Sequence, residues 1–497
     1  MKPILVLLLM AGLAPLLMAQ QFTQLKNSPL STKPGDSRSI NLVDLNGDGL
    51  DDVFVSKGLK GGQNNDLFFN LGKGNFQAVT TDSIALDMSP SDGATFADTD
   101  NDGDLDAYVT TWYRRPNLFY LNDGKGGFTH IPKGITGSMG TYSETAAFGD
   151  YDNDGLVDIY ITNSAGDKRN LLYRNKGNND FERVSIDWLN EALPSRSANW
   201  ADFDNDGDLD LFVANEEAQP NSLFRNMGKG NFEKIINDPV AKDTFSSITA
   251  SWGDVNNDGF LDLFVGNAGY MKAQNNQLFL NTGKGGFTLA PSGPLSTDGG
   301  CSFGSAFADF DNDGDLDLFV SNGYCTGEMV NFLYRNRGDG TFERDLSSLP
   351  NYQTPCSFGT AWGDLNNDGF LDLMVATCKN GEKDPEPNNL VFMNNGNTNR
   401  WLKIRLQGLA SNRAAIGAKI RVKTKINGKS VWQMREISAQ TGYAGQSSLT
   451  THFGLGTAQR IEELIVEWPS GAKQKFSKVK AEKTYQLLEK GKLVSIN

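Results

Sequence analysis

The chain has 497 residues, of which 60 are acidic and 46 basic, and its formal net charge at pH 7 is −14. A negative excess of this size argues against nucleic acid and against an anionic membrane surface as partners, because both would repel it. The excess is concentrated in one short acidic loop that recurs along the chain.

The N-terminal segment predicts export. Residues 1–19 contain Lys2, an apolar run and a small residue, Ala19, before Gln20. This pattern is typical of a cleaved secretory signal peptide, because the run is too short for a membrane anchor and has no stop-transfer flank. We therefore expect a secreted protein, extracellular or associated with the cell surface, without membrane insertion.

The recurring loop has Asp or Asn at positions 1, 3 and 5, Gly at position 6 and Asp at position 9. Calcium takes about 6–8 oxygen ligands, which alternate side chains and the backbone carbonyl of position 7 can supply, while the glycine permits the sharp turn. Positions 1, 3, 5 and 9 hold 25 Asp and 3 Asn in the seven copies, so about seven Ca²⁺ ions would nearly cancel the net charge. The predicted calcium ligands are Asp44, Asn46, Asp48, Leu50 and Asp52; Asp98, Asp100, Asp102, Asp104 and Asp106; Asp150, Asp152, Asp154, Leu156 and Asp158; Asp202, Asp204, Asp206, Asp208 and Asp210; Asp254, Asn256, Asp258, Phe260 and Asp262; Asp309, Asp311, Asp313, Asp315 and Asp317; and Asp364, Asn366, Asp368, Phe370 and Asp372.

An EF-hand loop begins in the same way, but it needs a bidentate Glu at position 12 and a helix on each side. Here position 12 is Val or Ile in every copy, and the residues around it form apolar runs such as LDLFVSN that are typical of buried strands. The EF-hand hypothesis is therefore excluded.

The spacing of the loops predicts the fold. Successive copies are 52–55 residues apart, a period typical of a repeat architecture. Each repeat has a strand of small residues before the loop, an apolar strand after it, a third strand, and a turn such as NLGKGNF, in which we expect Asn and Gly to supply positive φ, before a fourth strand begun by Phe. Seven such repeats predict an all-β, seven-bladed β-propeller over residues 20–398, in which residues 22–25 complete the last blade and close the ring.

The C-terminal part has a different pattern. Residues 399–497 contain alternating segments such as WLKIRL and AKIRVKT without helical spacing. They predict a small β-sandwich packed beside the ring.

Four cysteines bracket the last two acidic loops. In an antiparallel hairpin, residues at equal distances from the turn face each other, and this register favours Cys301–Cys325 and Cys356–Cys378 among the three possible connectivities. Free buried thiols are the alternative. An exported chain is expected to form the disulfides.

The functional predictions separate the two ends of the ring. Seven chemically alike loops indicate mainly structural calcium, although an open coordination site for an acidic partner or a sugar is the alternative. The opposite end carries connectors that differ between blades, and variable loops on a rigid scaffold often bind partners. Trp112, Tyr113, Arg114 and Arg115 form the candidate partner-binding patch, because aromatic residues and Arg are enriched at binding hot spots. Alternatively, these residues only cap a blade.

Catalysis has little support in the sequence. The chain contains only His130 and His452, and no nucleophile, zinc or GxSxG motif is recognisable. We therefore expect no catalytic residues and no enzyme. The alternative is a carbohydrate-active enzyme resembling a polysaccharide lyase, since such enzymes can work through Lys, Arg or Tyr.

The motifs also carry a family resemblance. The acidic loops with their flanking strands resemble the FG-GAP/VCBS repeats of integrin-type propellers, and the segments SNRAAIGAKIRV, GYAGQSS, THFGLG and IVEWPSG resemble an ASPIC/UnbV domain. The combination is similar to the cartilage acidic protein family. It implies a secreted calcium-binding interaction or adhesion protein with an extracellular protein or glycan partner, which would dock on the end of the ring away from the calcium loops.

Overall fold

The computed structural model describes residues 20–135, 142–187, 189–242, 244–269, 272–326, 329–349 and 354–496. The predicted signal peptide, residues 1–19, lies outside the described residues. Strands dominate the described part, with one short helix, α1 (Pro294–Thr297), and the 3-10 turns η1 (Pro29–Ser31), η2 (Ser83–Ala85) and η3 (Pro239–Ala241). The fold is therefore all-β, as predicted.

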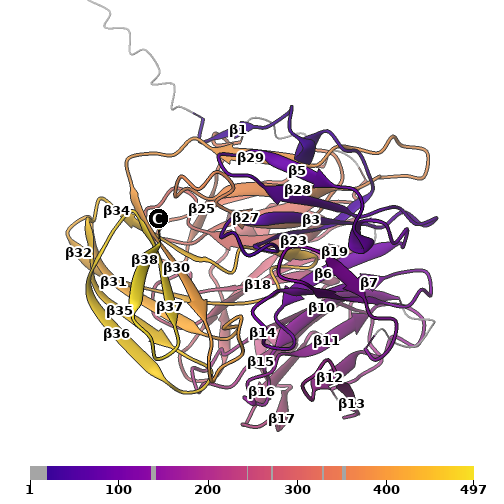
Figure 1. Ribbon diagram of the computed structural model, residues 1–497, viewed down its shortest axis with the longest axis horizontal. Helices are drawn as coiled ribbons and strands as arrows, with labels where there is room; N and C mark the ends of the chain where they lie inside the picture. Colours follow the sequence, from indigo (N-terminus) through magenta and orange to yellow (C-terminus); the bar gives the residue numbers. More distant parts are fainter. Residues whose placement is uncertain are drawn as a thin grey trace, which may run out of the picture.

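Seven of the sheets in the described residues share one construction of four antiparallel strands, arranged like the blades of a β-propeller (Figure 1). From the axis outward, the first four are β2 (Ser37–Val43), β3 (Asp52–Lys57), β4 (Asp66–Asn70) and β5 (Phe76–Val79); β6 (Ser91–Ala97), β7 (Asp106–Thr111), β8 (Leu118–Asn122) and β9 (Phe128–His130); β10 (Ser143–Gly149), β11 (Asp158–Asn163), β12 (Leu171–Asn175) and β13 (Phe181–Val184); and β14 (Ser195–Ala201), β15 (Asp210–Asn215), β16 (Ser222–Asn226) and β17 (Phe232–Ile235). The other three are β18 (Ser247–Gly253), β19 (Asp262–Gly269), β21 (Gln277–Asn281) and β22 (Phe287–Leu289), with the short β20 (Lys272–Ala273) on β19; β23 (Ser302–Ala308), β24 (Asp317–Asn322), β25 (Phe332–Asn336) and β26 (Phe342–Arg344); and β27 (Ser357–Gly363), β28 (Asp372–Thr377), β29 (Leu390–Asn394) and β1 (Phe22–Gln24).

The seven sheets form a closed ring. Each innermost strand contacts the innermost strand of the next sheet, and β27 contacts β2. The N-terminal β1 pairs with β29, with Phe22 opposite Asn394 and Gln24 opposite Phe392. The predicted closure by residues 22–25 is thus confirmed, and it joins the two ends of the ring in one sheet.

Apolar layers between neighbouring sheets hold the ring together. Between the third and fourth sheets, Trp200 packs with Tyr160 and Phe224 in one buried cluster, and its indole Nε1 donates to the carbonyl of Ala147 at 3.1 Å. The second strand of each sheet, such as β15, is buried on both faces, which explains its continuous apolar run.

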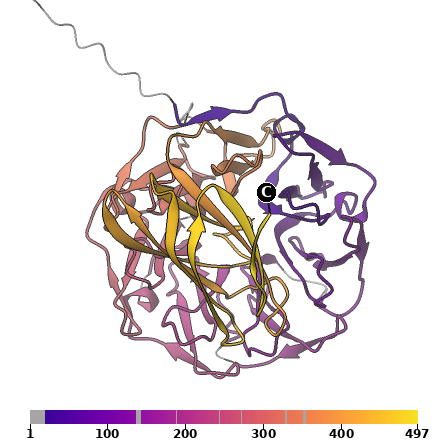
Figure 2. The same cartoon turned by 60° about the vertical axis from the view of Figure 1, so that its left-hand side comes forward.

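The C-terminal residues form two four-stranded sheets that lie across one face of the ring (Figure 2). One sheet has the order β34 (Thr451–Gly456), β30 (Arg400–Gln407), β37 (Lys483–Leu488) and β38 (Leu493–Ile496); the other has β32 (Lys429–Glu436), β31 (Lys419–Ile426), β35 (Arg460–Glu467) and β36 (Lys473–Lys480). Leu402, Ile420 and Leu464 belong to one buried apolar cluster, as the alternating patterns predict for a sandwich.

This C-terminal part does more than pack beside the ring, because residues 438–448 enter its axis. There β33 (Gly445–Gln446) pairs in parallel with the innermost strand β2, with Gly445 opposite Ile40. The approach is so close that a Cβ added to Gly359 would lie 1.8 Å from the carbonyl oxygen of Ala444. The small residues of the innermost strands therefore leave room for this axial loop, residues 438–448.

Both predicted disulfides are present. Cys301 pairs with Cys325 and Cys356 with Cys378, with Cα–Cα distances of 5.7 and 5.0 Å. Each joins the residue just before an innermost strand to the connector after the neighbouring strand. Among the described residues, the structure has no helix long and apolar enough to cross a bilayer.

Candidate functional site

The seven acidic loops share one hydrogen-bonded geometry. The position-6 glycine N–H donates to Oδ2 of the position-1 Asp at 2.8–3.1 Å in every copy. The N–H of position 7 donates to Oδ1 of the position-5 Asp at 2.9–3.0 Å. These bonds turn the side chains of positions 1 and 5 back onto the loop and set their orientation before any cation binds.

Carboxylates converge where position 3 is also Asp. The structure places one oxygen from each member of four triads within 4.8 Å of the others: Asp98, Asp100 and Asp102; Asp150, Asp152 and Asp158; Asp202, Asp204 and Asp206; and Asp309, Asp311 and Asp317. In the other three loops position 3 is Asn46, Asn256 or Asn366. A set of closely spaced carboxylate oxygens fits a hard divalent cation such as Ca²⁺, which would neutralise them when bound. The position-7 carbonyls remain predicted ligands.

In several loops an arginine of the third strand pairs with the position-3 Asp, a contact that was not predicted from the sequence. Arg174 lies 2.6 Å from Asp152, Arg225 lies 3.0 Å from Asp204, and Arg335 pairs with Asp311. Where position 3 is Asn, the equivalent residue of the third strand is apolar, namely Phe69, Leu280 and Met393. An extra carboxylate at position 3 is therefore accompanied by a guanidinium in three of the four loops. The pattern was visible in the sequence as Asp and Arg varying together.

The clustered carboxylates are strained electrostatically without a cation. Burial raises the pKa of Asp98 and of Asp106 to about 7, and neighbouring carboxylates of the same loop add to the rise. Burial likewise raises the pKa of Asp262 to about 8, with Asp254 and Asp258 adding to it. A divalent cation would remove this repulsion, which supports a stabilising role for calcium.

The position-9 Asp also organises the ring. Its Oδ1 accepts the backbone N–H of an Asn at the end of the third strand at 2.7–3.0 Å. The side-chain amide of that Asn donates to the position-2 carbonyl of the preceding blade's loop at 2.7–3.0 Å, so each blade is tied to its neighbour. These asparagines, which we name the inter-blade asparagines, are Asn70, Asn122, Asn175, Asn226, Asn281, Asn336 and Asn394.

The prediction that Asn and Gly supply positive φ in the turns is confirmed for the glycines and for Asn178 and Asn179 of the third copy, but it was wrong for the inter-blade asparagines. In the first copy Asn70 ends β4, whereas Gly72, Lys73 and Gly74 have the positive φ values of 82°, 55° and 73°. The repeated Asn is explained by the bonds between blades, and the glycines by the turn.

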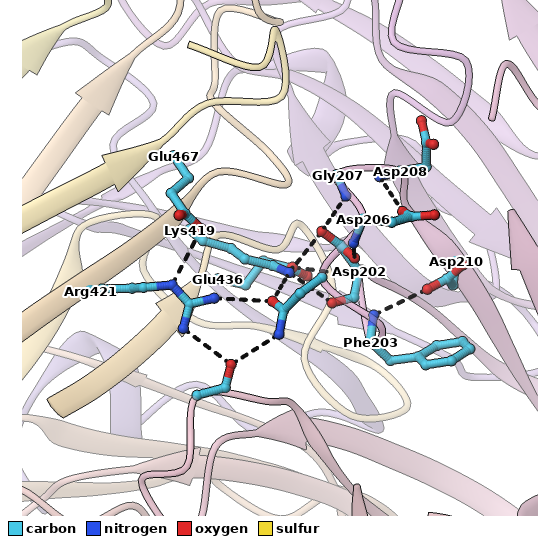
Figure 3. Close-up of polar contacts among 12 residues, drawn as sticks. Asp202, Phe203, Asp206, Gly207, Asp208, Asp210, Lys419, Arg421, Glu436 and Glu467 are labelled. Atoms are coloured by element: carbon cyan, nitrogen blue, oxygen red, sulfur yellow. Dashed lines mark hydrogen bonds and ion pairs between the residues drawn. The ribbon is translucent and has the colours of Figure 1, made fainter. Parts of the chain in front are cut away.

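The C-terminal sheets dock on the acidic-loop end. Lys419 and Arg421 of β31 point toward the fourth loop, where Lys419 Nζ lies 2.7 Å from Asp202 Oδ2 (Figure 3). Lys403 of β30 makes the same contact with Asp364 at 2.6 Å. Arg405 donates to the carbonyl of Gly49 at 2.7 Å. Cationic side chains thus cover part of the acidic surface, so the opposite end of the ring, away from these sheets, is the more accessible one.

That opposite end contains an axial cavity of about 360 Å³. The second residue of each of the seven innermost strands lines its wall. These residues are Arg38, Asp92, Glu144, Arg196, Ile248, Phe303 and Phe358. The first residue of each of these strands is Ser, and in five of the strands its hydroxyl bonds to a neighbouring asparagine, as Ser195 does to Asn215 at 2.7 Å. The seven innermost strands therefore share the first Ser but differ in the residue that follows it.

The floor of the cavity comes from the axial loop. The hydroxyl of Tyr443 lies 2.5 Å from Asp92 Oδ2 and also contacts Glu144. Arg196 pairs with Glu144 at 2.9 Å and with Glu216 at 2.8 Å. Burial and the charge of Glu144 raise the pKa of Asp92 well above its usual range. Burial opposes ionisation of Glu144, but Arg196 holds the pKa of Glu144 below its usual value.

The predicted partner-binding patch is divided by the structure. Trp112 and Tyr113 line the axial cavity, and Trp112 Nε1 donates to Glu144 at 2.8 Å. Arg114 and Arg115 are exposed and do not line it. The structure therefore places two of the four residues at the cavity and two away from it.

The residues on the wall of the cavity were missed in the sequence. They can be recognised in the sequence once the repeats are aligned on the innermost strand, because the residue after the constant Ser then differs from repeat to repeat.

Comparison with known families agrees with these repeats. Residues 44–109, 107–161, 150–213, 202–265, 254–320 and 324–375 match the FG-GAP-like repeat, and residues 408–494 match the family described as ASPIC and UnbV. The chain belongs to the family of FG-GAP-like repeat proteins, with a C-terminal ASPIC/UnbV domain.

Among individual proteins, cartilage acidic protein 1 of Xenopus tropicalis is 30% identical over 279 residues, which cover 54% of this chain and 40% of that protein. The human protein of the same name is 28% identical over 274 residues, covering 53% of this chain and 39% of its own length. The chain thus matches less than half of the length of these relatives, and it is a distant homologue of them.

Solved structures give weaker similarities. The BP39L lectin from Burkholderia pseudomallei is 10% identical with a TM-score of 0.49, covering 73% of this chain and 98% of that one. A lectin from Agrocybe aegerita that recognises non-reducing terminal N-acetylglucosamine is 16% identical with a TM-score of 0.42, covering 82% of this chain and 91% of that one. At TM-scores below 0.5 these similarities carry no conclusion about this chain.

Proposed function

We propose that the chain is an exported, calcium-stabilised interaction protein that binds an extracellular protein or glycan through the end of the ring opposite the acidic loops. The observation that carries this proposal is the axial cavity, because its wall is built at the position where the seven innermost strands differ most in charge and size. A position kept only for structure would be expected to repeat, as the preceding Ser does.

The other end of the molecule supports the same division of roles. The acidic loops have a shared geometry suited to a divalent cation, and the C-terminal sheets cover part of them. Two disulfides suit an oxidising extracellular environment. Calcium would stabilise the scaffold, while the accessible end would contact the partner.

The proposal is tested by a binding screen of the full chain against a glycan array and a panel of extracellular proteins, with calcium and with a chelator. Arg114→Glu, at the accessible end, is expected to weaken capture of the partner at least fivefold. Lys229→Glu is the matched control, because Lys229 is an exposed residue in a glycine turn at the acidic-loop end. Equal loss with both variants, or with neither, would contradict the proposed binding end.

A carbohydrate-active enzyme is the second candidate, since the cavity contains Tyr443 beside two carboxylates and two arginines. However, burial and the nearby Asp92 and Glu144 raise the pKa of Tyr443 well above its usual value, which makes its hydroxyl a poor source of a catalytic base. Incubation with acidic polysaccharides, followed by absorbance of unsaturated sugars, tests this candidate. Steady product formation that Tyr443→Phe abolishes would favour the enzyme over the binding protein.

A further inference from the structure

The wall of the axial cavity has one polar and one apolar side. The second residues of the first four innermost strands are charged, whereas those of the last three are Ile248, Phe303 and Phe358. Because consecutive blades are neighbours in the ring, the charged residues share one side and the apolar residues the other. A ligand that fits this cavity must itself have an apolar face and a face or edge of hydrogen-bonding groups.

The charged side chains on the polar side are already paired with one another. Arg38 pairs with Asp36 at 3.1 Å, and its guanidinium lies 4.5 Å from the ring centre of Phe358. Arg196 is paired with two glutamates, and Asp92 is engaged by the Tyr443 hydroxyl at 2.5 Å and by Arg38 at 3.9 Å. A charged ligand would meet side chains whose charges are already paired, which favours a neutral ligand with donors and acceptors.

The mouth of the cavity presents aromatic surface in a fixed position. The indole of Trp112 is held by its hydrogen bond to Glu144. The ring of Tyr113 packs edge-on against this indole, and the two ring centres are 5.4 Å apart. Tyr113 and Arg114 both have positive φ, 57° and 61°, a backbone conformation that is unfavourable for non-glycine residues. The turn between β7 and β8 therefore holds Tyr113 at the cavity in a conformation that its sequence does not favour. Strain of this kind is often found at ligand sites.

We propose that the axial cavity binds an uncharged sugar residue at the end of a glycan, with its C–H face against the aromatic side and its hydroxyls on the charged side. The inference rests on the proposed function and names the chemistry of the partner. A cavity of about 360 Å³ is within the usual range for small-ligand sites, about 300–1,000 Å³, and holds one such residue. Tyr443 forms the floor of the site, so the C-terminal part of the chain contributes to recognition.

The test is isothermal titration calorimetry of the full chain in calcium with the methyl glycosides of glucose, galactose, mannose and N-acetylglucosamine. Methyl glucuronide and glucosamine serve as the anionic and cationic probes. We expect at least one neutral glycoside to bind at least tenfold more tightly than both charged probes. Tyr113→Ala is expected to weaken that binding at least tenfold, since Tyr113 is 37% exposed and its loss should not unfold the ring.

Trp432→Ala is the matched control, because Trp432 is an equally exposed aromatic residue (36%) on the C-terminal sheet. It should leave binding unchanged, and the melting temperatures of both variants report whether they fold. The inference is overturned if no neutral glycoside binds, if a charged probe binds as tightly, or if Tyr113→Ala has no effect. A protein partner captured by the wild type and lost with Arg114→Glu, but unaffected by Tyr113→Ala, would overturn the sugar site and leave the proposed function standing.

Discussion

Tyr443 and Asp92 are 351 positions apart in the sequence, yet the Tyr443 hydroxyl lies 2.5 Å from Asp92 Oδ2 on the axis of the ring. The contact is buried, and it links the axial loop to an innermost strand. The C-terminal part of the chain is thus built into the centre of the propeller as well as onto its face.

Replacing Tyr443 with Phe tests how much this contact contributes to the stability of the fold. Loss of the hydroxyl leaves Asp92 and Glu144 without a shared buried partner, and we expect a fall of about 1–3 kcal/mol in the free energy of unfolding. Chemical denaturation measures it. Tyr485→Phe is the control, since Tyr485 is only partly buried and should change stability by less than about 0.5 kcal/mol; equal effects would show that the axial contact is unimportant.

Asn226→Ala tests the bonds between blades. Its side-chain amide donates to the carbonyls of Tyr151 and Leu209 at 2.7 and 3.1 Å, and both would lose a buried partner. We expect destabilisation of about 2–4 kcal/mol in thermal or chemical unfolding. Asn231→Ala changes an exposed Asn in the following turn and should be nearly neutral. A neutral Asn226→Ala variant would refute the stabilising role of the inter-blade asparagines.

Gly359→Ala tests the insertion of residues 438–448. The new methyl group would collide with the carbonyl of Ala444, so the axial loop is expected to leave its position. Limited proteolysis should then cleave within 438–448 many times faster than in the wild type. Gly293→Ala is the control, because its added Cβ would meet open space; unchanged proteolysis of Gly359→Ala would contradict the insertion.

Glu489 provides a pH-dependent prediction. Glu489 is 1% exposed, and its carboxylate accepts the backbone N–H groups of Leu409, Ala410 and Ser411 at 2.7–2.9 Å. Although burial opposes ionisation, these bonds and that of Ser470 lower the pKa of Glu489 to about 2. Because the folded-state pKa is depressed from 4.5, the stabilisation is complete above about pH 4.5 and is lost as pH falls toward 2.

The measurement is the free energy of unfolding between pH 6 and pH 2 for the wild type and Glu489→Gln. The variant is expected to be less stable at pH 6 and to lose less stability on acidification. Glu462→Gln, an exposed substitution on the same sandwich, should keep the wild-type slope. Parallel slopes for Glu489→Gln and the wild type would exclude this role for Glu489.

The features that the sequence predicted correctly depend on local or repeated patterns. The loop chemistry is contained within nine residues, and the pairing of Cys301 with Cys325 follows from the hairpin register around one loop. The closing strand was recognisable because Phe22 begins a segment like the fourth strand of other blades. These inferences needed no knowledge of how distant segments meet.

The features that were missed depend on contacts between distant segments. The insertion of Tyr443 into the axis places a C-terminal loop among strands hundreds of residues away, and no local pattern encodes that. The bond from Asn226 to Tyr151 crosses from one blade to the one before it. The divergent wall position became meaningful only when the ring brought seven strand ends around one cavity.

The central claim is that the acidic loops hold divalent cations that stabilise the ring presenting the axial cavity. The most direct measurement is the calcium content of the full chain after gel filtration in calcium-containing buffer, by mass spectrometry of the metal. The account predicts about seven Ca²⁺ ions per chain. A preparation that is folded yet carries no more than one ion would contradict it.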